Sequence, residues 1–315
     1  IAGRDCESGH VVGFGCRSVT ERFVNGRPEA VGYLSSLRLL EAHRNRGLVA
    51  RGYAYFRKMH GDGLARLYLT TIAEGNDLAL GLLTSGRAGL PAYYYAGRYH
   101  TAALPLSGRR RARTAPGIDV RPARADDLPA LVEWLRAVGP RRQFFPVYDV
   151  SDFGTEGGIF KNLRPEQMLL ASRGGRLAGV LAGWDQHGYR QTVVYGYGRA
   201  LRWARPLYNA WARWRSLPPL PAAGEELRYL TAALPVAEDA EVFAALLEAL
   251  LARSAGGAAA YLLLGLHEND PLLEVVRSYR ARWYTTRLYL VCWEDGEETR
   301  RALDGRPPYL ELGCL

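Results

Sequence analysis

The sequence predicts an α/β fold with a mixed sheet, built from two consecutive halves that repeat one order of elements. Three observations lead to this prediction. An apolar, strand-like run at residues 33–40 turns through a glycine loop into a helix-like stretch. A cluster of arginines between Pro105 and Pro116 then divides the chain. Beyond it, strand-like and helix-like stretches return in the same order.

The first half opens with a hairpin over residues 10–40. It turns at Asn25 and Gly26, a dipeptide typical of two-residue turns between antiparallel strands. Its second strand ends in the apolar run at 33–40. A helix is expected from residue 49 to about 60, followed by a strand at 65–72.

The loop at residues 44–49 joins the first of these strands to the helix. The first N–H groups of a helix lack partners inside it, and the helix dipole gives them partial positive charge. Gly47 lets a ligand approach the backbone without meeting a Cβ. Arg44 and Arg46 add positive charge beside those groups. The loop is therefore predicted to bind a phosphate, and two arginines suit a diphosphate.

These segments resemble the GNAT superfamily of N-acetyltransferases. In that family a strand precedes Gln/Arg-x-x-Gly-x-Gly/Ala, whose amides wrap the pyrophosphate of acetyl-CoA; Arg44 and Gly47 match its first and fourth positions. Val49 departs from the sixth, where a small residue normally lets the cofactor come close. Asn76 and Ala79 match the family's Asn-x-x-Ala, in which Asn helps to hold the pantetheine end.

The resemblance implies two tandem GNAT-like domains and an acyl-CoA-dependent N-acyltransferase, with acetyl-CoA as co-substrate. The strand at 37–40, splayed from its neighbour as in the family, would offer a backbone N–H to the thioester carbonyl. The residues that the resemblance assigns to acetyl-CoA are Leu37, Leu39, Leu40, Arg44, Asn45, Arg46, Gly47, Leu48, Val49, Ala50, Asn76 and Ala79.

The acid and base of the reaction are less well marked. Where many family members carry a tyrosine that protonates the departing thiolate, this chain has Leu83. Tyrosines alternate faces in the strand at 91–95, so either Tyr94 or the pair Tyr93 and Tyr95 could point toward the thiol. We take Tyr94 as the candidate acid.

Glu41 is the candidate base, because it is close in sequence to the phosphate loop. His43 has a similar position, and both could equally be solvated loop residues without a function. Together with Tyr94, Glu41 completes the predicted catalytic residues.

The domain boundaries follow from the arginine cluster at Arg109–Arg111 and Arg113. Its Pro and Gly neighbours favour a solvated hinge over a binding patch. We therefore expect a first domain at residues 1–106, a linker at 107–117 and a second domain at 118–315. The first lacks the opening strand and helices of the family. We expect that residues precede Ile1, because a sheet edge would otherwise lie bare.

The second half repeats the element order without the phosphate loop. The expected elements are a strand at 118–120, a helix from about 127, a hairpin at 168–182 turning at Gly174-Gly175, strands at 227–236, 259–266 and 283–293, and helices at 240–253 and 271–280. Ala237-Glu238-Asp239 stands where the loop belongs. Its carboxylates satisfy the dipole of the next helix and would repel a diphosphate, so no acetyl-CoA is expected there.

An aromatic and basic insert spans residues 184–214. Trp203, Leu207, Trp211 and Trp214 have helical spacing, which favours packing against the neighbouring domain. Alternatively, Asp185, Gln186 and Gln191 orient a polar acceptor in a cleft. Residues 143–146 and 152–153 either wall the acceptor site, as in tandem GNAT proteins, or anchor loops.

Composition limits the partners. The net charge is +9, yet lysine occurs only at positions 58 and 161 and arginine is spread throughout, as in a bacterial, GC-rich genome. A nucleic-acid partner is therefore not expected. The four cysteines and six histidines lack metal-ligand spacing, so no metal is expected. No long apolar run or secretory signal occurs, which favours a cytoplasmic protein without a membrane partner.

The acceptor is expected to be a small-molecule or peptide amine bound near the domain interface. The sequence does not fix its identity, the acyl chain length or the oligomeric state. A non-catalytic GNAT-fold module for ligand binding or assembly is the alternative function.

Overall fold

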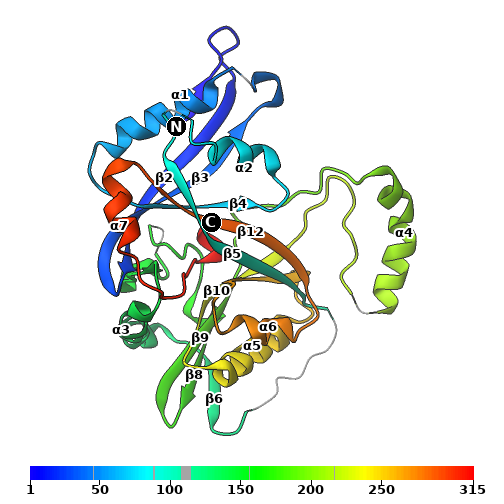
Figure 1. The fold of residues 1–315 in the computed structure, drawn as a ribbon. Coiled ribbons are helices and arrows are strands. Elements are labelled where there is room, and N and C mark those ends of the chain that lie inside the picture. Colours follow the sequence, from blue (N-terminus) through cyan, green and yellow to red (C-terminus); the bar gives the residue numbers. More distant parts are fainter. Residues whose placement is uncertain (45, 88, 108–114, 156, 216) are drawn as a thin grey trace.

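A single mixed sheet runs through both halves of the chain (Figure 1). The computed structural model describes residues 1–44, 46–87, 89–107, 115–155, 157–215 and 217–315. Within them the strand order is β1-β2-β3-β4-β12-β5-β11-β10-β9-β8-β6, with β7 paired to β2. The pairs β3–β4 and β10–β11 are parallel and the other pairs are antiparallel. The predicted α/β fold with a mixed sheet is confirmed.

The strands lie close to where the sequence patterns predict them. Their bounds are β1 Ala2–Arg4, β2 Val11–Val24, β3 Arg27–Leu39, β4 Tyr68–Ala73, β5 Ala92–Pro105, β6 Ile118–Pro122, β7 Phe145–Pro146, β8 Met168–Arg173, β9 Arg176–Trp184, β10 Tyr229–Ala237, β11 Tyr261–His267 and β12 Arg282–Cys292.

Helices cover the sheet or project from it. They are α1 Leu48–His60, α2 Asp77–Leu83, α3 Leu128–Val138, α4 Arg199–Trp214, α5 Ala240–Ser254, α6 Leu273–Arg277 and α7 Glu297–Arg301. The helix expected at 271–280 is shorter than predicted. At its end the Ser278 hydroxyl donates to the Val275 carbonyl at 2.7 Å, a local bond that competes with helix continuation.

The two halves contribute strands to one another's part of the sheet. β12, close to the C-terminal end, lies between β4 and β5 of the first half. β5 in turn pairs with β11 of the second half over Tyr99–Pro105. The expected linker stays a prediction, because Arg109–Arg111 and Arg113 lie outside the described residues.

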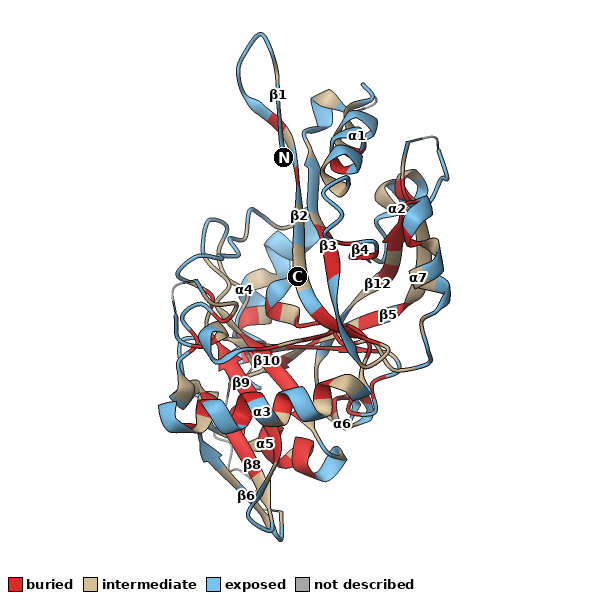
Figure 2. Cartoon of the chain, turned by 90° about the vertical axis from the view of Figure 1, so that its left-hand side faces the viewer, coloured by how far each residue is buried: buried red, intermediate tan, exposed pale blue. Residues whose placement is uncertain are grey.

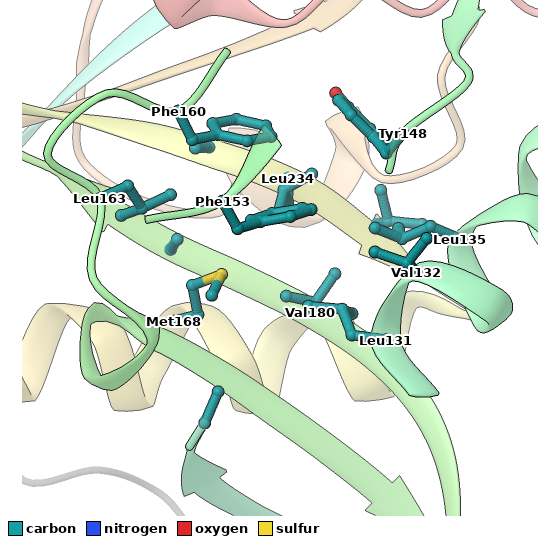
Figure 3. Packing of buried hydrophobic residues seen from close by; sticks show 14 of the residues in the cluster. Leu131, Val132, Leu135, Tyr148, Phe153, Phe160, Leu163, Met168, Val180 and Leu234 are labelled. Carbon is teal, nitrogen blue, oxygen red and sulfur yellow. The ribbon is translucent and has the colours of Figure 1, made fainter. Parts of the chain in front are cut away.

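Strand alternation divides the second half's core between the two faces of the sheet. Met168 and Leu170 of β8 pack with α3 in an aromatic cluster that includes Phe153 and Phe160 (Figure 3). Leu169 faces the other way, into the cluster built on α5. Figure 2 shows the buried strands enclosed between these helices.

On the first half, α1 packs on the sheet through Tyr53 and Phe56, together with Leu34, Tyr68 and Ile72. The opposite face is covered by the C-terminal segment, which brings Leu310 against Tyr33 and Leu69. This arrangement leaves one end of β3, beside α1 and α2, free of a covering layer.

Gly32 of β3 is required for close packing at this junction. A Cβ there would collide with the fully buried ring of Tyr68. We expect Gly32→Ala to lower the free energy of unfolding by about 2 kcal/mol, because overpacking forces the ring from its place. Denaturant unfolding measures this. In the control Gly81→Ala, where a Cβ would meet nothing within 4 Å, stability is expected to stay or rise. Equal stability of Gly32→Ala and the parent would contradict this packing.

Candidate functional site

The pairing between β3 and β4 ends early and opens the sheet. The two strands pair only at Gly32 and Tyr33, and the Thr70 hydroxyl then donates to the Leu34 carbonyl at 2.7 Å. Ser36 has φ +57°, and the register of β3 against β2 shifts at this point. Such a bulge bends its strand. The main chain of β3 beyond it is therefore left without a β4 partner.

Helix α1 begins beside this opening at Gly47, whose φ is +68°. A Cβ at Gly47 would meet nothing within 4 Å, so the position favours glycine for its left-handed backbone and not for space. Among the described residues no side chain caps the helix. The N–H groups of Leu48, Val49 and Ala50 thus face the loop as an uncapped helix N-terminus, which suits an anion.

A cleft of about 690 Å³ connects the strand opening, the loop and α2. Leu37 and Leu78 are 40% and 66% exposed and give it apolar walls. The predicted cofactor residues that line it are Leu37, Leu39, Leu40, Arg44, Val49, Asn76 and Ala79. Arg46, Gly47, Leu48 and Ala50 follow along the loop and α1 but do not line the cleft, and Asn45 lies outside the described residues.

Sequence reasoning missed part of this lining. Residues 11–14 of β2, Arg38, Leu78 and Leu82 also line the cleft. Leu78 and Leu82 are spaced by one helical turn, which was a usable signal. The approach of β2 to α2 depends on tertiary structure, and no sequence signal could have predicted it.

Val49 lies partly in the cleft and partly in the core. Its side chain is half-buried and packs against the cluster around Tyr53 and Phe56. Part of the valine side chain, which is larger than the small residue of the family pattern, therefore packs in the core and does not enter the cleft.

Asn76 begins α2. Its side-chain oxygen accepts a hydrogen bond from the Ala79 amide at 3.2 Å, which caps the helix. The carboxamide nitrogen remains available as a donor toward the cleft, which Asn76 lines.

The candidate acid is placed away from the cleft. Tyr94 faces the layer opposite α1, with the Arg300 guanidinium 3.9 Å from its ring centre. Tyr93 faces α1, where its hydroxyl is hydrogen-bonded to that of Tyr53, and burial raises the pKa of Tyr93 well above its ordinary value. Tyr95 packs edge-on against Tyr289. None of these three lines the cleft, so the predicted role of Tyr94 gains no support from its position.

Glu41 lies in a short 3₁₀ turn between β3 and the loop. Its carbonyl accepts the Arg44 amide at 3.1 Å, and its side chain is exposed. His43 belongs to the same turn. Neither lines the cleft, so the structure does not bring the candidate base to the opening. Leu83, at the position of the family's tyrosine, is 6% exposed and lines the inner wall of the cleft.

The second half has a matching strand opening that its own chain fills. β10 and β11 pair only over Tyr229–Thr231, and Leu234 has φ +54°. The Leu234 amide donates to Glu311 Oε2 at 3.0 Å, and the Tyr309 hydroxyl donates to the same oxygen at 2.8 Å. Glu311 is buried, which raises the pKa of its carboxyl to about 7.

The helix N-terminus in the second half is also occupied. Asp239 Oδ1 accepts the Glu241 and Val242 amides, each at 3.0 Å. Arg173 forms an ion pair with the same carboxylate. These contacts leave the start of α5 without the free amides that α1 presents.

The aromatic insert is arranged differently from the prediction. Trp203, Leu207 and Trp214 of α4 are 78%, 78% and 77% exposed, so the expected packing of this face against the neighbouring domain is wrong for the described residues. Of the three residues of the alternative acceptor site, only Asp185 lines a cavity, one of about 260 Å³ in the second half that shares no lining residue with the cleft. Gln186 is buried and donates to the Gly313 carbonyl at 2.8 Å, and Gln191 donates to the His187 carbonyl at 3.0 Å.

The loop around Gln143 is part of the core. Phe144 and Phe145 are buried, and Gln143 donates to Asp304 at 2.8 Å. The described residues contain no group of three or more His, Cys, Asp or Glu side chains arranged to hold a metal ion.

Two solved structures share this architecture. The chain is similar to a GCN5-related N-acetyltransferase from Sphaerobacter thermophilus, with a TM-score of 0.55 and 14% identity over 90% of this chain and 77% of that one. It is also similar to a GCN5-related N-acetyltransferase from Anabaena variabilis, with a TM-score of 0.50 and 9% identity over 90% of this chain and 60% of that one, less than two thirds of that protein. No protein-family model and no curated protein sequence matches the chain. At such identities the similarity establishes the fold alone, so the mixed α/β fold of these acetyltransferases is confirmed, and the predicted division into two tandem domains with one acetyl-CoA loop stays a prediction.

Proposed function

We propose that this chain is an acyl-CoA-dependent N-acyltransferase that uses acetyl-CoA and acts on an amine acceptor. The observation that carries the proposal is the cleft in which the unpaired end of β3 meets the uncapped start of α1. Acetyl-CoA needs both features in one cleft, because its thioester requires a hydrogen-bond donor and its diphosphate requires an anion site. The fold shared with GCN5-related N-acetyltransferases supports the same conclusion.

The residues of the cleft fit the parts of acetyl-CoA. The diphosphate would lie against the amides of Leu48, Val49 and Ala50, with Arg44 and Arg46 as counter-charges. Neither arginine forms an ion pair with another described residue, so their charge is available. Leu37 and Leu78 offer apolar contact to the pantetheine, and the Asn76 carboxamide can donate to one of its amide carbonyls.

The unpaired main chain of β3 polarises the reacting carbonyl. Beyond Ser36 its N–H groups have no β4 partner, so one of them can donate to the oxygen that gains negative charge. The acceptor nitrogen forms a bond to the acyl carbon as the carbon–sulfur bond breaks. The amine loses a proton and the sulfur leaves as CoA thiol. We assign no acid or base, because Tyr94 and Glu41 both lie outside the cleft lining.

A turnover assay tests the proposal. The chain is incubated with acetyl-CoA and a panel of small amines and amine-bearing peptides, and free CoA thiol is measured beside the mass of each acceptor. The expected result is thiol release that depends on an acceptor and matches a 42-dalton gain on it, about the mass of an acetyl group. Thiol release without acceptor modification would contradict acyl transfer to an amine.

One observation favours a second candidate, a non-catalytic module that binds a CoA-like ligand. Leu83 lines the cleft with an apolar side chain where the family's acid would stand, and the described cleft lining contains no tyrosine. This candidate predicts acetyl-CoA binding without turnover for any acceptor in the panel.

A further inference from the structure

Helix α4 carries an apolar face that the described part of the chain leaves uncovered. Trp203, Leu207 and Trp214 are more than three quarters exposed. At about 3.6 residues per turn, they share one stripe along the helix. The full stripe consists of Ala200, Trp203, Ala204, Leu207, Ala210, Trp211 and Trp214. Figure 1 shows α4 at the periphery of the molecule, away from α1 and α2. Large exposed apolar surfaces of this kind mark interaction sites.

The opposite flank of α4 fixes its orientation. The Asn209 side chain is buried, accepts the Leu220 amide at 2.8 Å and donates to the Leu220 carbonyl at 3.1 Å. Arg282 of β12 donates to the Tyr208 hydroxyl at 3.0 Å. The Tyr208 bond ties this flank to β12 and the Asn209 bonds tie it to the segment after the helix, whereas Trp203, Leu207 and Trp214 face outward, as their exposed fractions show.

The segment around α4 is strongly cationic. No Asp or Glu occurs between Asp185 and Glu225. The arginines of that interval are Arg190, Arg199, Arg202, Arg205, Arg213 and Arg215. None of them forms an ion pair with another described residue. Their uncompensated charge selects an anionic partner.

The distribution of charge and apolar surface distinguishes among anionic partners. Arg199 and Arg215 border the stripe on its two sides, and Arg202 and Arg213 lie behind it. Arg215 lies over the Trp214 ring, 5.7 Å from its centre, whereas Arg202 and Arg213 lie on another face than the tryptophans, and this partial separation is typical of helices that lie in a membrane interface. A single-stranded nucleic acid favours aromatic and basic groups interleaved on one surface. Pairing the stripes of two copies would bring the bordering arginines together.

We propose that α4 docks the protein on a membrane surface rich in anionic phospholipid. Trp203, Leu207 and Trp214 enter the boundary between headgroups and acyl chains, and the flanking arginines contact the headgroup phosphates. The sequence predicted no membrane partner because no long apolar run occurs. In the part of the chain that the structure describes, no helix has the length and apolarity to cross a bilayer. Docking on the surface of a bilayer requires neither a long apolar run nor a helix that crosses it.

Vesicle co-sedimentation tests the docking. The full chain is mixed with vesicles of phosphatidylcholine alone or of an equimolar mixture with phosphatidylglycerol. We expect binding to the anionic vesicles only. The triple variant Trp203→Ser, Leu207→Ser and Trp214→Ser is expected to bind at least about 100-fold more weakly. The control Leu64→Ser with Val150→Ser changes exposed apolar residues outside α4 and is expected to bind as the parent does.

A charge series separates the arginine contribution. Arg199→Gln, Arg213→Gln and Arg215→Gln together are expected to weaken binding about 100-fold. The control Arg27→Gln, Arg164→Gln and Arg176→Gln removes the same charge elsewhere and should have a much smaller effect. Equal loss in both sets, or unchanged binding by the triple serine variant, would overturn the proposal. So would absence of vesicle binding, including the cases where the parent instead binds an oligonucleotide or self-associates through α4.

Discussion

Gly47→Glu is expected to weaken acetyl-CoA binding at least about 100-fold, or about 2.7 kcal/mol. The new carboxylate would stand at the start of α1, beside the amides and arginines that we propose hold the diphosphate. It would repel the ligand and also offer these groups an internal partner. Steric overlap at the Cβ does not contribute, because a Cβ at this position would meet no atom within 4 Å, but a non-glycine residue at φ +68° strains the backbone, so a control for strain is needed.

Ligand-dependent thermal stability measures this effect. Acetyl-CoA at about 100 times its Kd stabilises the parent by about 2.7 kcal/mol, and the variant should show almost no gain at the same concentration. Gly175→Glu is the matched control. Gly175 also has positive φ, +76°, and an open Cβ position, but it lies in the β8–β9 turn. An equal loss of ligand stabilisation in both variants would show that backbone strain, and not the phosphate site, causes the loss.

Stability is expected to fall by about 3 kcal/mol as pH rises from about 4.5 to above 7, through the ionisation of Glu311. Burial raises the pKa of this carboxyl from 4.5 to about 7. The unfolded chain therefore loses the Glu311 proton first as pH rises. The contribution is fully present below pH 4.5 and is lost as pH passes through the folded pKa.

Thermal unfolding of Glu311→Gln between pH 5 and pH 8 isolates this contribution. The amide cannot ionise, so the decline across that range should shrink relative to the parent. Glu298→Gln, at an exposed position of α7, should retain the parental decline. A Glu311→Gln profile parallel to the parent's would mean that Glu311 is ionised throughout or does not determine the pH dependence.

The sequence predicted those parts of the fold that depend on local chemistry. Asn25 and Gly26 both have positive φ in the turn between β2 and β3, as the hairpin prediction requires. Helix α1 begins one residue before the predicted position, directly after Gly47. Turn residues and helix ends follow from backbone preferences of single residues, which the sequence displays.

Long-range arrangement was beyond the same reasoning. The strand at β12 was predicted, but its place between β4 and β5 was not, because periodicity identifies a strand without identifying its neighbours. Alternation in β5 left open which face Tyr94 takes, and packing against Arg300 decides it.

Two further features depend on what covers a surface. Helical spacing identified the stripe of α4, but spacing does not reveal whether another element covers the stripe. In the structure, none of the described residues covers it. Glu311 carried no sequence signal for its bond to the Leu234 amide, since the two lie 77 positions apart.

Calorimetric titration of acetyl-CoA into the parent chain tests the central claim most directly. The claim is that the opening beside β3 holds acetyl-CoA, whereas the matching opening beside β10 is closed by Glu311 and Asp239. The account predicts saturable binding of one acetyl-CoA per chain. Absence of binding would contradict the cofactor site, and two equivalents per chain would contradict the closure of the second opening.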